Sequence, residues 1–378
     1  MRIGLITTLR TNIGDDLVRE GICLVLRAAA GAKTLQFVAI NKHDPLSAYP
    51  AGHPLAAARK FSQLMPRGRQ RFVKSMARVF YPLHNSLFDS CEMIVQCGTP
   101  VAWYGCARSE FAAPVWDQIV GRLSRVGVVA ANLGAGSCYP WTQQPSEVTN
   151  EQDAAFLRRI LGYCRVTTVR DTLAQRLFGQ LGASCQTLPC PAMLTGRLRE
   201  VPSTNGEFIV INYMELGGHY DYGQGIDAAR WRDSITKVVK RLQRRHQVVM
   251  LCHNEQEYEL ARGFASPADP FLPRDTNELF SILSRAKAGI FNRLHAAVAL
   301  SGIGIPSVAV GNDTRLGMVE ELGLPCHYVE ETDSEQLEHE VESLVSDRPR
   351  HMERLLAIRD RAYEGYSDIA GGLFQARN

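Results

Sequence analysis

Short apolar runs rich in β-branched residues alternate with segments of helical periodicity along most of the chain. Runs such as MIVQC, FIVINY and IPSVAV are separated by stretches in which apolar residues recur every three or four positions. Strands separated by helices form βαβ units, whose strands lie parallel in a sheet that helices cover on both faces. The alternation therefore predicts an α/β fold with doubly wound parallel sheets.

The same alternation predicts where the elements lie. The expected strands are residues 3–8, 35–40, 93–97, 126–133, 165–169, 185–188, 208–213, 247–252, 288–291 and 305–311. The expected helices are residues 15–30, 111–124, 151–163, 171–181, 226–245, 254–265, 275–286, 294–302 and 314–322, with a mostly helical segment over residues 334–375.

A chain of 378 residues is long enough for two domains of roughly 150 residues each. Prolines and polar residues gather between residues 189 and 206, where one αβ unit ends and a fresh strand begins. We expect a Rossmann-like N-terminal domain over residues 1–195, a Rossmann-like C-terminal domain over residues 206–345 and a helical tail over residues 346–378. Ligands of such sheets bind at the carboxyl ends of the strands, so the cleft between the domains is the expected site.

Composition excludes several classes of protein. The net charge of +3 argues against a nucleic-acid partner, and no apolar run reaches the roughly 18 residues of a membrane span. The opening MRIGLITTLR reads as a strand and not as a signal peptide, so we expect a soluble, cytoplasmic protein. The ten cysteines form no C-x2-C pair and no Cys/His group at zinc spacing. We therefore expect reduced thiols in the core and no metal site.

One segment, residues 59–78, carries seven Lys or Arg side chains and no acidic residue, with apolar residues between them. The first interpretation is a solvated helical face packed on the N-terminal domain. A second is a surface that meets anionic lipid or a diphosphate-linked substrate, which would place the protein at the inner face of the membrane. Nucleic-acid binding is the third and weakest alternative.

Polar residues follow the first expected strand at the turn into a helix. Asn12 and Gly14 suit a tight turn, and Asp15 or Asp16 is expected to cap the helix. Glycine-bearing turns after later strands are expected to let the backbone approach a ligand or to present amides to an anion. These turns contain Gly98, Thr99, Gly134, Gly136 and Ser137, and none of them completes a nucleotide-binding glycine motif.

The stretch from Ala288 to Pro325 is the most informative. Asn292, Arg293 and His295 lie at one strand-to-helix turn, and Asn312 and Arg315 lie at the next. Histidine is the side chain most easily adjusted to act as an acid or base near neutral pH. A guanidinium offers a fork of donors that matches a carboxylate or a phosphate.

A third polar junction, Arg170-Asp171, closes the strand RVTTV. Asp171 is expected to cap the following helix, and Arg170 is expected to point from the strand end toward the cleft. There it could pair with a carboxylate of the protein or hold an anionic ligand.

Taken together, N-x-G-D at residues 12–15, V-R-D at residues 169–171 and R-L-H at residues 293–295, followed by GIPSVAV, resemble the polysaccharide pyruvyl transferase family. The resemblance extends over residues 12–325. It implies two Rossmann-like domains in a glycosyltransferase-B-like arrangement, with a helix at the end of the chain crossing back. It also implies transfer of a pyruvate ketal from phosphoenolpyruvate to a sugar of a cell-surface or exported glycan.

The resemblance assigns roles to residues as well. His295 and Asp15 correspond to catalytic residues, and Arg170, Arg293, Arg315 and Asn292 to donor-binding residues, with Arg315 standing where the family often has lysine. The C-terminal domain would take the donor and the N-terminal domain a glycan or a lipid-linked saccharide, with phosphoenolpyruvate as co-substrate and no cofactor or metal. The expected cleft loops contain Asn12, Gly14, Gly98, Thr99, Gly134, Gly136, Ser137 and Asn312.

Two other functions remain open from the sequence. One is a glycosyltransferase of the same architecture with a nucleotide-sugar donor, in which Asp313, Glu320 or Glu321 could bind a ribose. The other is a relative without catalytic activity.

Overall fold

The computed structural model describes residues 1–9, 12–63, 86–109, 111–200, 206–218, 222–264 and 270–375. Most of the basic segment 59–78 lies outside these residues. The hypothesis that this segment contacts a membrane therefore concerns residues that the structure does not describe. No helix in the described ranges is long and apolar enough to cross a membrane. Within the same ranges, no group of three or more His, Cys, Asp or Glu side chains is placed to hold a metal ion.

The first sheet is parallel throughout, with strand order β2-β1-β3-β5-β6-β7, and the short strand β4 pairs with β5. Its strands are β1 (Arg2–Thr7), β2 (Gln36–Asn41), β3 (Met93–Cys97), β4 (Pro100–Ala102), β5 (Val129–Ser137), β6 (Cys164–Val169) and β7 (Gln186–Thr187).

The second sheet is also parallel, with strand order β12-β11-β10-β8-β9. Its strands are β8 (Phe208–Asn212), β9 (Gln247–Met250), β10 (Ala286–Phe291), β11 (Ser307–Gly311) and β12 (Cys326–Tyr328).

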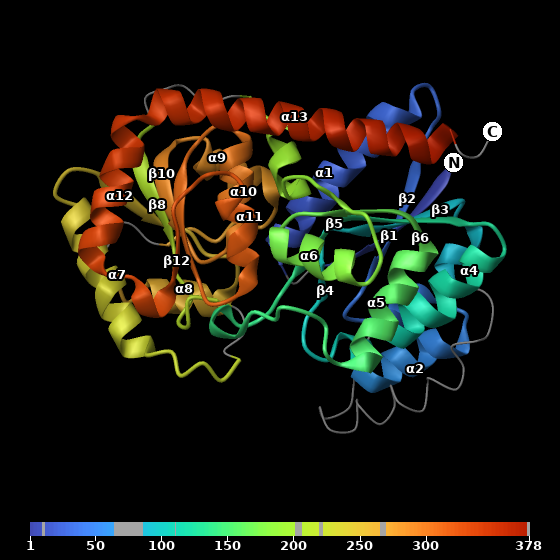
Figure 1. The fold of residues 1–378 in the computed structure, drawn as a ribbon. Coiled ribbons are helices and arrows are strands. Elements are labelled where there is room, and N and C mark those ends of the chain that lie inside the picture. The colour runs from blue at the N-terminus through green and yellow to red at the C-terminus, as the bar shows by residue number, and fades with distance from the viewer. Residues whose placement is uncertain are drawn as a thin grey trace.

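Helices cover both faces of each sheet (Figure 1). Those around the first sheet are α1 (Ile13–Ala30), α2 (Pro54–Gln63), the π-helix η5 (Ala112–Val120), α4 (Gly121–Arg125), α5 (Glu151–Tyr163) and α6 (Thr172–Gln180). Those around the second are α7 (Ala228–Leu242), α8 (Glu255–Ala261), α9 (Thr276–Leu283), α10 (Leu294–Gly302), α11 (Gly317–Glu320) and α12 (Ser334–Ser346). The predicted fold class, two doubly wound parallel α/β units followed by a C-terminal helical segment, is confirmed.

Several local expectations differ from the structure. The glycine-bearing segment 134–137, expected as a loop, is the end of strand β5, because β4 pairs with it on one side. The N-cap of α1 is Asn12, whose side-chain oxygen accepts from the Gly14 amide, and not Asp15 or Asp16. The stretch expected as a polar linker contains a buried 3-10 helix, η7 (Pro191–Leu198). Short strands β4 and β12 were not expected.

Helices α1 and α10 pack together between the two sheets, and η7 packs against both. The contact is close, since a Cβ on Gly21 of α1 would lie 2.0 Å from the carbonyl oxygen of Pro191. One apolar core runs from β1 through these helices to β10. Because α1 and α10 each begin at the carboxyl edge of a sheet, this packing brings the two helix N-termini together.

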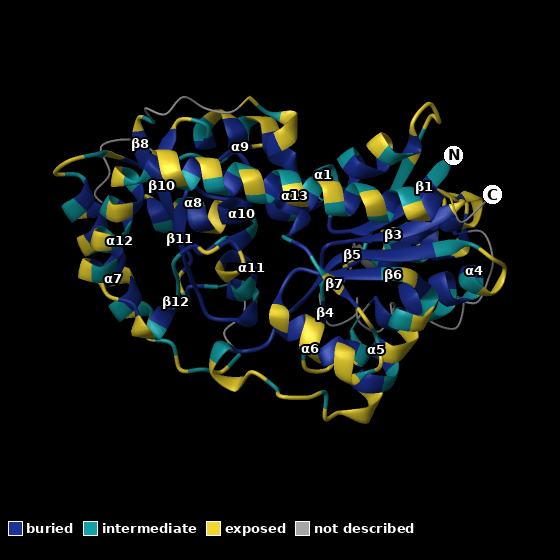
Figure 2. Ribbon diagram, turned by 45° about the horizontal axis from the view of Figure 1, so that its top comes forward, coloured by how far each residue is buried: buried dark blue, intermediate teal, exposed yellow. Residues whose placement is uncertain are grey.

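The last helix, α13 (Arg348–Gln375), runs along both halves of the molecule and contacts α1, η7 and α10 (Figure 1). Its buried residues Leu355, Ala362 and Tyr366 recur at helical spacing, which gives the helix a buried face and an exposed face (Figure 2).

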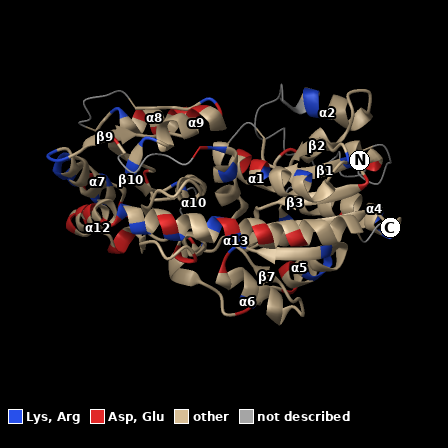
Figure 3. Ribbon diagram, turned by 90° about the horizontal axis from the view of Figure 1, so that it is seen from above, with Lys and Arg blue, Asp and Glu red and all other residues tan. Residues whose placement is uncertain are grey.

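Charged residues lie mainly on the outer helices (Figure 3). Arg241 of α7, for example, pairs with Glu335 at 3.0 Å and with Glu338 at 3.1 Å on α12. All ten cysteines fall in the described ranges as unpaired thiols, and nine of them are buried.

Candidate active site

Each sheet reverses its strand order at one point, between β1 and β3 in the first sheet and between β8 and β10 in the second. Ligands of open parallel sheets bind outside the carboxyl ends of the strands at such reversals. Asp15 lies in the first turn of α1, directly after β1, and His295 lies in the first turn of α10, directly after β10. The packing of the two helices brings His295 Nδ1 to 3.6 Å from Asp15 Oδ1.

Gly14 allows this approach. A Cβ at this position would lie 2.9 Å from the Cβ of His295 and 3.0 Å from its Nδ1, which is closer than ordinary van der Waals contact. Asn12 holds the same turn, because its side-chain oxygen accepts from the Gly14 amide at 3.1 Å and its amide group donates to Asp15 at 3.4 Å. The N-x-G-D motif is therefore a helix start shaped to receive the histidine of the other sheet.

Arg170 lies behind His295 and does not line the cavity described below. Its side chain is 1% exposed, and its Nη1 donates to the Gly98 carbonyl at 2.5 Å and to His295 Nε2 at 2.9 Å. Gly136 makes room for the guanidinium, since a Cβ there would lie 2.6 Å from Nε. Nε and Nη2 have no hydrogen-bond partner among the described residues.

This contact fixes the tautomer of His295. A guanidinium only donates hydrogen bonds, so Nε2 must accept and the ring proton must sit on Nδ1, facing Asp15. The pKa of His295 is lowered to about 3, first by burial and then by the positive charge of Arg170. The imidazole is therefore neutral at physiological pH.

Asp15 and Lys42 complete the charged cluster. Burial by itself would raise the pKa of Asp15, but the electrostatic interactions with His295 and then with Lys42 outweigh it, and the pKa is lowered. Lys42 directly follows β2, the neighbour of β1, and is 7% exposed. Burial lowers the pKa of Lys42 to about 8, although Asp15 opposes that shift. Asp15 is thus an ionised carboxylate beside a buried ammonium group.

These groups face a cavity of about 710 Å³ between the two sheets. Its wall combines aromatic rings from the first half with cationic side chains from both halves. The residues that line it are Thr8, Asn12, Asp15, Lys42, His43, Pro100, Trp103, Ser109, Phe111, Cys138, Tyr222, Asn254, Arg293, His295 and Arg315.

The two arginines on the wall are held by carboxylates behind them. Arg315 Nε and Nη2 donate to Asp313 at 2.8 and 2.6 Å. Arg293 Nε donates to Glu257 at 2.8 Å, and its Nη2 also contacts that carboxylate. Glu257 is 3% exposed and also accepts from Asn212 Nδ2 at 3.0 Å, so Arg293 is fixed in place.

The asparagines of both turns are engaged with backbone. The Asn292 side chain accepts from the Met214 amide at 2.8 Å and donates to the Val310 carbonyl at 2.7 Å, so it ties β10 to its neighbouring strands. Asn312 is fully buried and donates to the Leu216 carbonyl at 3.1 Å. Both residues shape the turns that carry the arginines.

The turns expected to present amides to an anion make internal bonds instead. The Ser137 amide donates to Asp171 at 2.9 Å, and the Gly134 amide donates to the Thr168 hydroxyl at 2.7 Å. Thr99 is buried and its hydroxyl contacts the Gln96 side chain. Asp171 does cap α6, as predicted. The expectation that the amides of Gly134 and Ser137 face an anion is therefore wrong.

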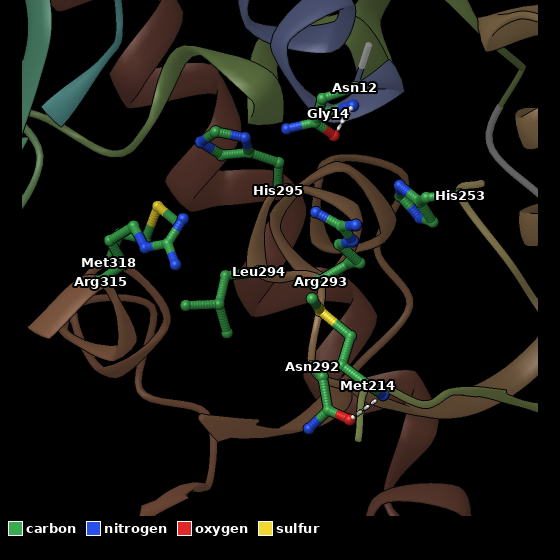
Figure 4. Close-up of a pocket in the computed structure, with 10 residues that line it drawn as sticks. All are labelled: Asn12, Gly14, Met214, His253, Asn292, Arg293, Leu294, His295, Arg315 and Met318. Atoms are coloured by element: carbon green, nitrogen blue, oxygen red, sulfur yellow. Dashed lines mark hydrogen bonds between the residues drawn. The ribbon is translucent and has the colours of Figure 1, made fainter. Parts of the chain in front are cut away.

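A recess of about 30 Å³ adjoins the cavity and shares Asn12, Arg293, His295 and Arg315 with it. His253, which follows β9, lines this recess, and in the view of Figure 4 Arg293 lies between its ring and that of His295. Sequence reasoning missed both Lys42 and His253. Their signal was position: Lys42 follows β2, which lies next to β1 and its motif, and His253 follows β9, which lies two strands away from β10 in the same sheet.

Several solved structures have a similar fold over nearly the whole chain. The MnaA–UDP co-structure from S. aureus is 12% identical with a TM-score of 0.56, covering 97% of this chain and 94% of that one. UDP-GlcNAc 2-epimerase from Neisseria meningitidis, bound to UDP-GlcNAc, is 9% identical with a TM-score of 0.56 and 100% coverage of both chains. The glycosyltransferase SnogD from Streptomyces nogalater is 14% identical with a TM-score of 0.51, covering 100% of this chain and 99% of that one.

Identities this low show the fold alone, which is the glycosyltransferase-B-like arrangement of two Rossmann-like units. A comparison with curated protein sequences finds no match. The sequence profile of polysaccharide pyruvyl transferases matches residues 119–314, more than half of the 378 residues, from η5 in the first half to the turn after β11 in the second. The chain belongs to the polysaccharide pyruvyl transferase family and is a transferase.

Proposed function

We propose that the protein transfers pyruvate from phosphoenolpyruvate to two hydroxyl groups of a sugar in a cell-surface or exported glycan, forming a ketal. One observation carries this proposal: a neutral histidine and an ionised aspartate from opposite sheets meet at a cavity edged by Lys42, Arg293 and Arg315. Phosphoenolpyruvate carries a carboxylate and a phosphate, and cationic side chains are needed to bind and orient both.

In the proposed reaction, the first sugar hydroxyl forms a bond to C2 of phosphoenolpyruvate, and C3 gains a proton to become a methyl group. The second hydroxyl then forms its bond to C2 as the bond from C2 to the phosphate oxygen breaks. Of the two hydroxyl protons, one balances the proton added to C3 and the other leaves with phosphate. No oxidant or reductant is involved, and none of these steps requires a metal or an organic cofactor.

Asp15 suits the role of base for a sugar hydroxyl, because it is ionised and lines the cavity. His295 suits the role of proton donor once the donor substrate is bound. Its pKa is about 3, with burial and then the charge of Arg170 as causes. A bound anion raises the pKa of a neighbouring imidazole. With phosphoenolpyruvate bound, His295 would gain a second proton at Nε2, which requires the hydrogen bond from Arg170 to break, and would donate the proton on Nδ1.

Arg170 is a positioning residue in this proposal, since it touches His295 and does not line the cavity. Lys42 and Arg315 are the cations that would face the donor from opposite sheets. For the acceptor, the half-buried Trp103 is an aromatic side chain on the cavity wall against which the apolar face of a pyranose ring can pack.

Thermal unfolding tests the choice of donor. A ligand that binds only the folded state raises the melting temperature. We expect phosphoenolpyruvate to raise the melting temperature of the wild-type protein and UDP-GlcNAc to leave it unchanged. The opposite result would favour a nucleotide-sugar glycosyltransferase. No shift with either ligand would count against both donors.

A further inference from the structure

Beside the proposed catalytic pair, His253 occupies a buried position that the reaction as described does not use. It is 9% exposed, and neither ring nitrogen has a hydrogen-bond partner among the described residues. Its backbone amide donates to Glu257 at 2.9 Å, which holds the start of the turn after β9. A buried imidazole without partners lowers stability unless something else supplies the missing bonds.

The recess that His253 lines has the size of a small polar group. At about 30 Å³ it can take roughly two water-sized atoms, because a space of about 10–15 Å³ by this measure holds one water. The two oxygens of a carboxylate fit that space. A phosphoryl group with three terminal oxygens, or a sugar ring, needs the larger cavity of about 710 Å³.

The charges around the recess also suit one planar oxyanion. Arg293 and Arg315 lie on its wall, and each is already paired with a carboxylate behind it, Glu257 and Asp313. Two guanidinium groups whose charge is partly balanced therefore border the recess, and its size favours the carboxylate of the donor over the phosphate. Met214, Leu294 and Met318 supply the apolar part of the wall.

We infer that His253 and this recess bind the carboxylate of the donor, with an imidazole N–H donating to a carboxylate oxygen, while the phosphate lies in the main cavity near Lys42. The inference rests on the proposed function for the identity of the donor. The pKa of His253, lowered to about 4 by burial, agrees with a neutral ring that donates one hydrogen bond. His253 is thus the residue that would distinguish a carboxylate-bearing donor from phosphate alone.

Calorimetric binding of three probes to the intact protein tests the inference: phosphoenolpyruvate, pyruvate and inorganic phosphate. The variant is His253→Phe, which keeps an aromatic ring and removes both nitrogens. We expect it to weaken phosphoenolpyruvate and pyruvate by about ten- to a hundred-fold, the loss typical of one hydrogen bond to a charged group, and to leave phosphate unchanged. His253→Asn, which keeps an N–H donor, should restore part of the affinity.

The matched control is His339→Phe, the same substitution at an exposed histidine of α12, which should change no affinity. Equal weakening of phosphate and phosphoenolpyruvate by His253→Phe, or no weakening at all, would overturn the inference. A variant that gains stability and keeps full affinity for phosphoenolpyruvate would show a recess filled by water only. If wild type does not bind phosphoenolpyruvate, the proposed function fails. Pyruvate binding then tests whether the recess takes a carboxylate: pyruvate must bind the wild-type protein and must not bind His253→Phe.

Discussion

Replacing Gly14 with alanine tests whether the contact between α1 and α10 places the catalytic imidazole. The new Cβ would lie 2.9 Å from the His295 Cβ and 3.0 Å from Nδ1. Non-bonded carbon atoms prefer about 3.5–4.0 Å, so His295 must shift by roughly half an ångström or more. Misplacement of a reacting group by about 1 Å can cost on the order of a hundred-fold in rate, so we expect kcat to fall by about ten-fold or more.

The fold should survive this change. Alanine is a better helix former than glycine by roughly 0.5–1 kcal/mol, which offsets part of the steric cost. The assay is phosphate release from phosphoenolpyruvate in the presence of acceptor, measured beside urea unfolding. The matched control is Gly372→Ala in α13, where a Cβ would meet nothing within 4 Å. Full activity of Gly14→Ala would refute the idea that this contact sets the position of His295.

Three further perturbations have defined outcomes. Because the pKa of His295 falls from 6.5 to about 3 on folding through burial, the unfolded state binds the extra proton as the pH drops below 6.5. Lowering the pH from 6.5 to 5 should therefore cost about 1.7 kcal/mol of unfolding free energy through this residue. The pH slope in urea unfolding of His295→Gln should be smaller by that amount, and the share of His253, whose pKa is lowered to about 4, should remain. Lys42→Met should raise the KM for phosphoenolpyruvate by about ten-fold or more and leave the melting temperature unchanged. The same change at the exposed Lys237 should leave both the KM and the melting temperature unchanged. Asp171→Ala should cost about 2–4 kcal/mol in urea unfolding, since it removes a helix cap and leaves the buried Ser137 amide without its acceptor. Asp333→Ala, at the exposed cap of α12, should cost only about 1 kcal/mol.

The sequence predicted the sheets well because strands buried on both faces leave uninterrupted apolar runs. It was less informative where a tertiary contact overrode a local preference. The segment 134–137 contains two glycines and reads as a loop, yet it is a strand because β4 pairs with β5 there.

The sequence likewise predicted some features of the candidate site and not others. The sequence placed Asp15 and His295 at turns that the structure brings together, because both follow strands beside a reversal of strand order. It did not show that Arg170 lies behind the imidazole, since the depth of a side chain depends on Gly136 and on the packing around it. Lys42 and His253 belong to no motif. Only the order of the strands within the two sheets places these residues at the site.

Running the reaction in deuterated water tests the central claim most directly. Wild type, phosphoenolpyruvate and a panel of pyranosides with two neighbouring free hydroxyl groups would be incubated together, and the products followed by NMR spectroscopy and mass spectrometry. We predict an acceptor with a pyruvate ketal whose methyl group carries one deuterium, one phosphate released for each ketal, and no product with His295→Gln. Phosphate release without a ketal, a methyl group without deuterium, or full product formation by His295→Gln would contradict the account.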